Sequence, residues 1–164
     1  MEYVKGLIKN FDEIKNLRKK TIENLIDISL PIWDDSYPSE DLIKEDIDKG
    51  NVRIVLDEGK IIAFAVLDRC ENEFGEYIFD EPNLMVFSRL MVDPENRNKG
   101  VGSFLVDNLC LEMKKEKASG CGIMVHPINT YAINFYEKNG FVFEKRKNYP
   151  YGDFSTYVKI FKNS

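Results

Sequence analysis

The sequence predicts a single domain of mixed α/β fold, and three observations lead to that prediction. Its 164 residues correspond to about one average domain, and 43% hydrophobic with 31% charged residues is a typical globular composition. Apolar runs of strand length alternate with segments whose apolar residues recur at helical spacing. Turn-forming residues join several of the predicted strands, which favours antiparallel pairs. We therefore expect one domain over residues 1–164.

The N-terminal third is expected to hold one strand and two helices. Residues 3–8 have the composition of a first strand, and apolar residues from Phe11 onward recur near helical spacing, with a break. The segment from Pro31 to Pro38 interrupts this pattern. Ser39 can then cap a short acidic helix that ends by Gly50.

Three strands are expected in the middle of the chain. Residues 52–56 and 60–67 are rich in β-branched side chains and are separated by a turn-forming triplet, which indicates a hairpin of central strands. Residues 71–81 carry five acids and no base, and we expect a loop or an edge segment there. A third strand, residues 84–92, is stopped by Pro94, because proline cannot donate to a continuing ladder.

The C-terminal half is expected to add two helices and three strands. The first helix has one apolar face, formed by Val106, Leu109, Cys110 and Met113 at helical spacing. It closes near residues 119–120. The remaining elements are expected in this order: a strand over residues 122–125, a helix over 129–138, and strands over 141–146 and 154–161 around a turn at 149–153.

Charge and composition exclude several classes of protein. The net charge of −5 repels polyanions, so no nucleic-acid partner is expected. The N-terminus lacks the pattern of a signal peptide, and the longest apolar run, residues 61–67, is far shorter than the ~20 residues that span a bilayer. Three cysteines, Cys70, Cys110 and Cys121, without metal-ligand spacing indicate neither a disulfide framework nor a metal site. We expect a cytoplasmic protein with no membrane partner; its oligomeric state is not evident from the sequence.

A glycine-containing segment between a strand and a helix is the most informative part of the chain. It reads Arg97, Asn98, Lys99, Gly100, Val101, Gly102, Ser103. Glycines allow a ligand to approach the backbone closely, and the free amides of a helix N-terminus favour an anion such as a diphosphate. The segment is neither an ATP-binding P-loop nor a dinucleotide-binding fingerprint. Taken alone, a glycine pair of this kind is more often an ordinary turn.

Two motifs resemble those of the GNAT superfamily of N-acetyltransferases. The strand that ends Leu90, Met91, Val92, Asp93, Pro94 is followed by Arg97-x-x-Gly100-x-Gly102, the form of the central motif of that family. The second motif is matched by Asn129 to Tyr136, followed by Gly140 and Phe141. The resemblance covers residues 84–143. It implies a mixed, mostly antiparallel sheet of about six to seven strands, flanked by about four helices.

The resemblance also implies a site for acetyl-CoA, with no metal. The strands over residues 84–92 and 122–126 would diverge and leave room for the pantetheine arm. The arm would pair with backbone groups of Leu90, Met91 and Val92, while the side chains of Leu90 and Val92 face the core. Backbone amides would hold the pyrophosphate with local positive charge, and the residues involved are Arg97, Asn98, Lys99, Gly100, Val101, Gly102 and Ser103.

Two residues of the second motif have both a structural and a functional interpretation. Asn129 can contact the cofactor, and it is also a preferred helix N-cap. Tyr136 lies one turn after Ala132 and corresponds to the family tyrosine that protonates the departing thiolate. The alternative for Tyr136 is an ordinary core tyrosine. Cys110 and Cys121 look like small buried residues, so we expect direct transfer without a covalent thiol intermediate.

The general base is not assigned by the resemblance. Some family members have a glutamate five residues before the position of Asn129, but this chain has Met124 there. His126 would lie on the same strand face as Met124, and an imidazole is a chemically suitable base near neutral pH. The alternative is a structural histidine that shapes the strand exit before Pro127.

The acceptor is expected to be a primary amine on a small molecule or a peptide. Residues 34–48 contain seven acids and one lysine, which would attract a cationic amine, although an ordinary solvated helix face is an equal explanation. Candidates for lining the acceptor site are Trp33, Asp34, Tyr37, Tyr149 and Tyr151. The sequence therefore predicts an acetyl-CoA-dependent N-acetyltransferase. The alternatives are a non-catalytic acyl-CoA-binding or regulatory domain of the same fold, and a phosphate-binding module for another nucleotide.

Overall fold

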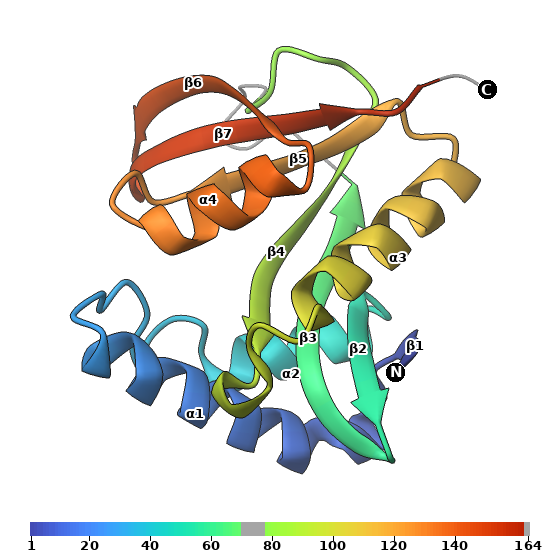
Figure 1. Cartoon of the computed structure of the whole chain (residues 1–164), viewed down its shortest axis with the longest axis vertical. Coiled ribbons are helices and arrows are strands. Elements are labelled where there is room, and N and C mark those ends of the chain that lie inside the picture. Colours follow the sequence, from blue (N-terminus) through green and yellow to red (C-terminus); the bar gives the residue numbers. More distant parts are fainter. Residues whose placement is uncertain (70–77, 163–164) are drawn as a thin grey trace. The chain divides into compact units, whose positions relative to one another are not determined.

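The computed structural model describes residues 1–69 and 78–162 as strands, helices and connecting turns (Figure 1). The predicted acidic segment at 71–81 therefore lies largely outside the described residues. In chain order the elements are β1 (Glu2–Lys5), η1 (Ile8–Asn10), α1 (Phe11–Asp27), α2 (Glu40–Asp48), β2 (Val52–Asp57), β3 (Lys60–Arg69), β4 (Leu84–Val92), η2 (Pro94–Asn96), α3 (Val101–Lys115), β5 (Gly120–Val125), α4 (Thr130–Lys138), β6 (Val142–Tyr149) and β7 (Gly152–Ile160).

The seven strands follow the order β1-β2-β3-β4-β5-β7-β6. β4 and β5 are parallel, while β1 with β2, β2 with β3, β5 with β7 and β6 with β7 are antiparallel. The predicted mixed, mostly antiparallel sheet and the predicted order of elements are confirmed. The predicted hairpin is also confirmed, because β2 and β3 pair directly inside the sheet.

The chain divides into two compact units. The first comprises residues 1–67 and 89–108, and the second comprises residues 68–88 and 109–164. β4 and α3 each run from one unit into the other.

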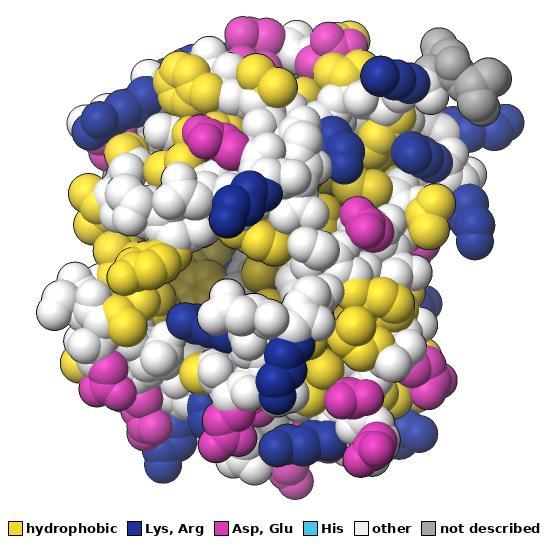
Figure 2. Space-filling model, viewed as in Figure 1, with side chains coloured by type: hydrophobic (Ala, Val, Ile, Leu, Met, Phe, Trp, Pro, Cys, Tyr) yellow, Lys and Arg dark blue, Asp and Glu magenta, His cyan; other side chains and the backbone are white. Residues whose placement is uncertain are grey.

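In Figure 2, acidic and basic side chains are interspersed over the face shown. Within the described residues, no helix has both the length and the hydropathy to cross a bilayer.

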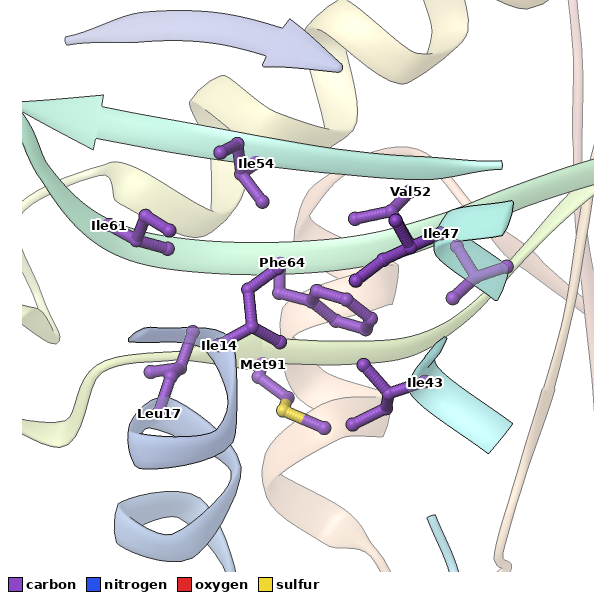
Figure 3. Close-up of a cluster of buried hydrophobic side chains, with 10 residues drawn as sticks. Ile14, Leu17, Ile43, Ile47, Val52, Ile54, Ile61, Phe64 and Met91 are labelled. Atoms are coloured by element: carbon purple, nitrogen blue, oxygen red, sulfur yellow. The ribbon is translucent and has the colours of Figure 1, made fainter. Parts of the chain in front are cut away.

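Phe64 lies at the centre of the first unit. Its side chain is fully buried, and Figure 3 shows it between Ile14 of α1, Ile43 of α2 and Met91 of β4. The side chains of one face of β2 and β3 thus pack against both helices. This packing holds the end of β4 against β3 and the helices that cover it.

Helix α1 is continuous, so the predicted break in this helix is wrong. The apolar spacing is interrupted because two polar residues, Arg18 and Thr21, occupy buried positions of the helix. The Thr21 hydroxyl donates to the Leu17 carbonyl, and the Arg18 guanidinium donates to the Pro38 carbonyl at 2.5 Å. Both polar groups therefore satisfy their hydrogen bonds inside the packed stripe.

Several predicted boundaries differ from the observed ones. β1 ends at Lys5, and a short 3-10 helix follows where the strand was expected to continue. β5 begins at Gly120, two residues earlier than expected. β6 and β7 extend to Tyr149 and Gly152, so they occupy most of the predicted turn. The predicted cap at Ser39 is confirmed, because its side chain accepts from the Leu42 amide at 3.1 Å.

The sheet of the second unit carries a different side-chain cluster on each face. On one face Phe87 of β4, Tyr136 of α4 and Phe141 form an aromatic group, with ring centroids 5.8 to 6.1 Å apart. The opposite face carries an apolar cluster whose members include Phe79, Met124 and Phe154. A Cβ at Gly122 would lie 2.7 Å from the Phe79 ring, so glycine allows this ring to approach β5.

We expect Phe64→Ala to destabilise the protein by about 3–5 kcal/mol, because the cavity at the centre of the first unit cannot close. Urea unfolding monitored by circular dichroism measures this change. Phe143→Ala removes the same atoms from a side chain that is 53% exposed and should cost less than about 1 kcal/mol. Equal losses for the two variants would contradict the assigned core.

Candidate functional site

The glycine-containing segment leads from β4 into α3 within the first unit. Asp93 is buried at the end of β4, where its carboxylate accepts from the Glu95 amide at 3.0 Å and pairs with Lys20 at 3.3 Å. The backbone then takes a positive φ at Asn98 (62°) and at Gly100 (76°). These two bends turn the chain directly into the first residue of α3.

The backbone amides at the start of α3 are available to a ligand. In the described part of the chain, the N–H groups of residues 100–103 donate to no protein acceptor, and the first such bond is from Phe104 to the Gly100 carbonyl at 3.0 Å. A Cβ at Gly100 would meet no atom within 4 Å, so the space beside it is open. Arg97 and Lys99 are exposed next to these amides. This arrangement of donors and positive charge suits an anion.

The backbone of β4 has one edge that is mostly unpaired. Its ladder with β5 covers only Leu84, Met85 and Val86, whereas the strand continues to Val92. At the far end, the Asp93 amide donates to the Ile62 carbonyl of β3 at 2.8 Å. Because backbone groups alternate along a strand, Met91 also faces β3, and Leu90 and Val92 face the opposite edge. These two residues can pair with an extended ligand.

The candidate acceptor residues of the first unit lie in a turn before α2. The Asp34 carboxylate accepts hydrogen bonds from the Ser36 hydroxyl at 2.6 Å and from the Ser36 amide at 2.8 Å, and these bonds lower the pKa of Asp34. The Tyr37 hydroxyl accepts from Arg89 at 3.3 Å. Trp33 packs partly buried against the first-unit core. Asp34 is therefore occupied in shaping the turn itself.

Several of the acids between residues 34 and 48 are also paired. Asp46 forms a two-pronged ion pair with Arg89, Asp35 lies 3.6 Å from Arg18, and Glu45 pairs with Lys49 at 3.0 Å. These partners reduce the negative charge that the bare sequence suggests for this stretch. Attraction of a cationic acceptor thus has less support here than the count of acids implies.

Tyr136 is buried in the aromatic group on one face of the second unit. Its ring contacts Phe87, Phe135 and Phe141. Burial raises the pKa of the Tyr136 phenol well above its ordinary value of 10.0, and the nearby Cys121 adds to the effect. The phenol is therefore fully protonated at neutral pH, as a proton donor must be.

Asn129 caps α4, so the structural interpretation of this residue is confirmed. Its side-chain oxygen accepts from the Ala132 amide at 3.2 Å. The cap leaves the side-chain amide nitrogen as a donor for a ligand. Cys110 and Cys121 are buried as expected, and burial raises the pKa of the Cys121 thiol well above its usual range, which disfavours a reactive thiolate.

His126 lies at one end of a row of aromatic rings. Its ring is 4.6 Å from that of Phe154, which is 5.6 Å from Tyr151, and Tyr151 stacks on Tyr149 at 5.4 Å and 8°. The structure thus brings together three of the predicted residues, His126, Tyr149 and Tyr151, in one unit. Phe154 joins them and was missed, because nothing in its local sequence distinguishes it from a core residue of a strand.

Two features of this row concern its polar groups. The Tyr149 hydroxyl is buried and has no hydrogen-bond partner among the described residues, although a buried hydroxyl normally has one. Asp153 pairs with Arg146 at 2.6 Å and also lies near His126. The hydrogen bond from Arg146 is the main cause that lowers the pKa of the Asp153 carboxyl, and His126 makes a smaller contribution in the same direction. The row therefore combines apolar surface, a free hydroxyl and a carboxylate.

The predicted residues fall on different faces of the second unit. Tyr136 belongs to the aromatic group with Phe87, whereas Met124 packs with the opposite cluster. His126 contacts Phe154 of that opposite cluster. The predicted proton donor and the predicted base thus belong to different side-chain groups of this unit.

Arg89 is the main residue that sequence reasoning missed. It is the one charged residue in the apolar run of β4, LMVFSRLMV. A lone cation in a buried strand is unusual, and this signal was available in the sequence. Its buried partner, Asp46, could not be identified without the fold.

Comparisons with known proteins agree with this fold. The model of the Acetyltransferase (GNAT) domain matches residues 48–143. No curated protein shows a significant match.

Many solved structures have the same fold at low identity. A GNAT-family acetyltransferase from Streptococcus agalactiae has a TM-score of 0.84 and 17% identity, covering 99% of this chain and 96% of that one. The ribosomal-protein-S18-alanine N-acetyltransferase from Escherichia coli has a TM-score of 0.71 and 17% identity, covering 99% and 95%.

A third structure was solved with a ligand. The PaiA N-acetyltransferase from Thermoplasma acidophilum, in complex with coenzyme A, has a TM-score of 0.71 and 21% identity, covering 98% of each chain. Because the family model matches more than half of the residues, the chain belongs to the GNAT family of acetyltransferases.

Proposed function

We propose that this protein is a cytoplasmic N-acetyltransferase that transfers an acetyl group from acetyl-CoA directly to a primary amine. The observation that carries the proposal is the group of unpaired amides at the start of α3, beside Arg97 and Lys99, in a chain of the GNAT family. We further propose that both compact units belong to one acetyltransferase domain. The family model supports this, because residues 48–143 include parts of each unit.

In this proposal β4 and the start of α3 hold the donor substrate, acetyl-CoA, which carries its acetyl group as a thioester. The amides of residues 98–103 bind the diphosphate, and Arg97 and Lys99 add positive charge. The free edge of β4 at Leu90 and Val92 pairs with the pantetheine arm as a further strand would. Met91 contributes through its side chain, which anchors β4 in the core, since its backbone faces β3.

Tyr136 is our candidate for the proton donor. Its phenol would give its proton to the sulfur atom that leaves when the amine attacks the thioester. Its raised pKa makes it a weak acid, but the leaving thiolate is a stronger base in an apolar site than in water. Backbone N–H groups of β4 stabilise the carbonyl oxygen as it gains negative charge.

His126 is our candidate for accepting the proton from the amine. It lies on the face of the second unit that also carries Met124, Phe154 and the tyrosines of the β6–β7 turn. Tyr149 and Tyr151 are the candidates for contacting the acceptor in this unit. Trp33, Asp34 and Tyr37 are candidates in the first unit, although Asp34 is held by its own turn.

A panel of amines tests the acceptor class. Structurally similar proteins are named for ribosomal-protein alanine and streptothricin acetylation, so their acceptors differ widely. A panel of an alanine-ended peptide, a polyamine and an amino sugar covers these chemistries. Release of free thiol from acetyl-CoA measures turnover with each amine.

A non-catalytic acyl-CoA-binding domain is the second candidate. The observation that favours it is Met124, which packs in an apolar cluster at the position where some family members place a glutamate base. This alternative predicts coenzyme A binding without acetyl transfer to any amine of the panel.

We expect Ser103→Asp to weaken coenzyme A binding by about tenfold or more, because its carboxylate competes for the same α3 amides. Isothermal titration calorimetry measures the Kd. The variant should be at least as stable as the wild type, since an acid at a helix N-terminus is favourable. Ser29→Asp adds the same charge at an exposed position of the first unit and should leave the Kd unchanged. Unchanged binding by Ser103→Asp would exclude this anion site.

We expect Tyr136→Phe to lower kcat by about 10- to 100-fold with little change in the KM for acetyl-CoA, because only proton donation is lost. Tyr131→Phe makes the same change on an exposed tyrosine of α4 and should keep full activity. Because burial raises the pKa of Tyr136, the wild-type kcat should show no loss from this phenol as pH rises to 10. If the Tyr136→Phe variant turns over at the wild-type rate, Tyr136 is not the proton donor.

A further inference from the structure

Arg89 adopts a left-handed backbone conformation inside a strand. Its φ is 53°, and it lies between Val86, the last residue paired with β5, and Leu90, the first residue of the free edge. This region is strained for a residue other than glycine, because the Cβ comes too close to the backbone. Something in the surrounding structure must therefore hold it there.

The side chain of Arg89 makes the contacts that keep its backbone in this conformation. Its Nε donates to Asp46 Oδ2 at 2.9 Å, its Nη2 donates to Asp46 Oδ1 at 2.8 Å, and its Nη1 donates to the Tyr37 hydroxyl at 3.3 Å. We call these three bonds the Arg89 clamp. The side chains of Arg89 and Asp46 are 15% and 6% exposed, so the pair is largely removed from water.

The partners of the clamp are themselves fixed. Asp46 lies on α2, which is capped by Ser39 and packed on the core through Ile43 and Ile47. Burial raises the pKa of Asp46, and the Arg89 hydrogen bonds offset part of this effect. A two-pronged pair of this kind is geometrically specific, and losing one member leaves the other buried and uncompensated.

The bend at residue 89 decides which way the next backbone groups point. An extended residue there would shift the alternation of backbone and side chains along the strand by one position. The observed conformation keeps the side chain of Met91 in the core and directs Leu90 and Val92 to the edge away from β3.

We propose that Arg89 is a positioning residue: its clamp to Asp46 and Tyr37 holds the left-handed backbone that presents Leu90 and Val92 to acyl-CoA. This inference rests on the proposed function for its consequence in binding. The conformational part concerns the protein alone. The competing explanation is that the guanidinium contacts a substrate itself.

The pair Arg89→Ala and Arg89→Gly tests the proposal, because both remove the guanidinium but only glycine adopts a positive φ without strain. The KM for acetyl-CoA should rise about tenfold in Arg89→Ala and stay within about threefold of wild type in Arg89→Gly. If both variants lose activity equally, or neither does, the positioning role is wrong.

Hydrogen exchange of the ligand-free protein provides a readout that does not depend on acetyl-CoA. The amides of Met91 and Asp93, which face β3, should exchange at least about fivefold faster in Arg89→Ala and near the wild-type rate in Arg89→Gly. Equal exchange in the two variants would overturn the proposal. A wild-type protein that binds no coenzyme A but shows this contrast would instead refute the proposed function alone.

Two further variants complete the test. Asp46→Asn keeps Arg89 but weakens the clamp, and it should move the KM and the exchange rates in the same direction as Arg89→Ala. It serves in place of Arg89→Ala should that variant fail to fold, and an Asp46→Asn protein identical to wild type would contradict the clamp. Glu45→Gln breaks the neighbouring exposed pair with Lys49 on the same helix and should change neither readout.

Discussion

Unpaired backbone groups along β4 are the constraint on which the rest of the arrangement depends. A strand inside a sheet normally satisfies both of its edges, and a buried N–H without a partner is costly. β4 pairs with β5 over three residues only and then continues for six more. Everything that holds this strand in place must therefore come from its other edge and from its side chains.

The first unit provides that support in two ways. Met91 is locked among Phe64, Ile14 and Ile43, so the end of β4 cannot rotate without opening the core. The ion pair between Arg89 and Asp46 fixes the strand to α2 a short distance earlier. Hydrophobic packing and a buried polar contact thus act on neighbouring positions of one strand, each limiting a different motion.

The features of the fold that could be predicted are those that depend on residues close together in the sequence. Element order, the caps at Ser39 and Asn129 and the stop at Pro94 follow from short-range chemistry that the sequence displays directly. The continuity of α1 was missed because Arg18 satisfies its hydrogen bonds with carbonyls of a turn about twenty residues away, and no local pattern reports such partners. The ion pair of Arg89 was missed for the same reason.

The same distinction holds for the residues of the candidate site. The glycine-containing segment and Tyr136 were found because a motif spans consecutive residues. Phe154 and Asp46 take part only through strand pairing and helix packing, which place distant positions together. The acids of residues 34–48 gave two interpretations, attraction of a cationic amine or a solvated helix face, because the sequence does not display their partners; in the structure several of them pair with arginine or lysine or bond within their own turn.

The unpaired edge of the outer strand β6 affects the solubility of the protein. As the last strand of the sheet it leaves one row of peptide groups unbonded to any described strand, and Val142 and Phe143 at its start are more than half exposed. Such a row invites edge-to-edge association and aggregation. Lys145 and Arg146 lie along this strand, and their ion pairs with Asp80 at 2.7 Å and with Asp153 at 2.6 Å reduce the positive charge that two copies would bring together. Charged side chains on an edge strand still disfavour such pairing, because association would have to desolvate them, so replacing them with neutral residues to improve crystallisation would lower solubility.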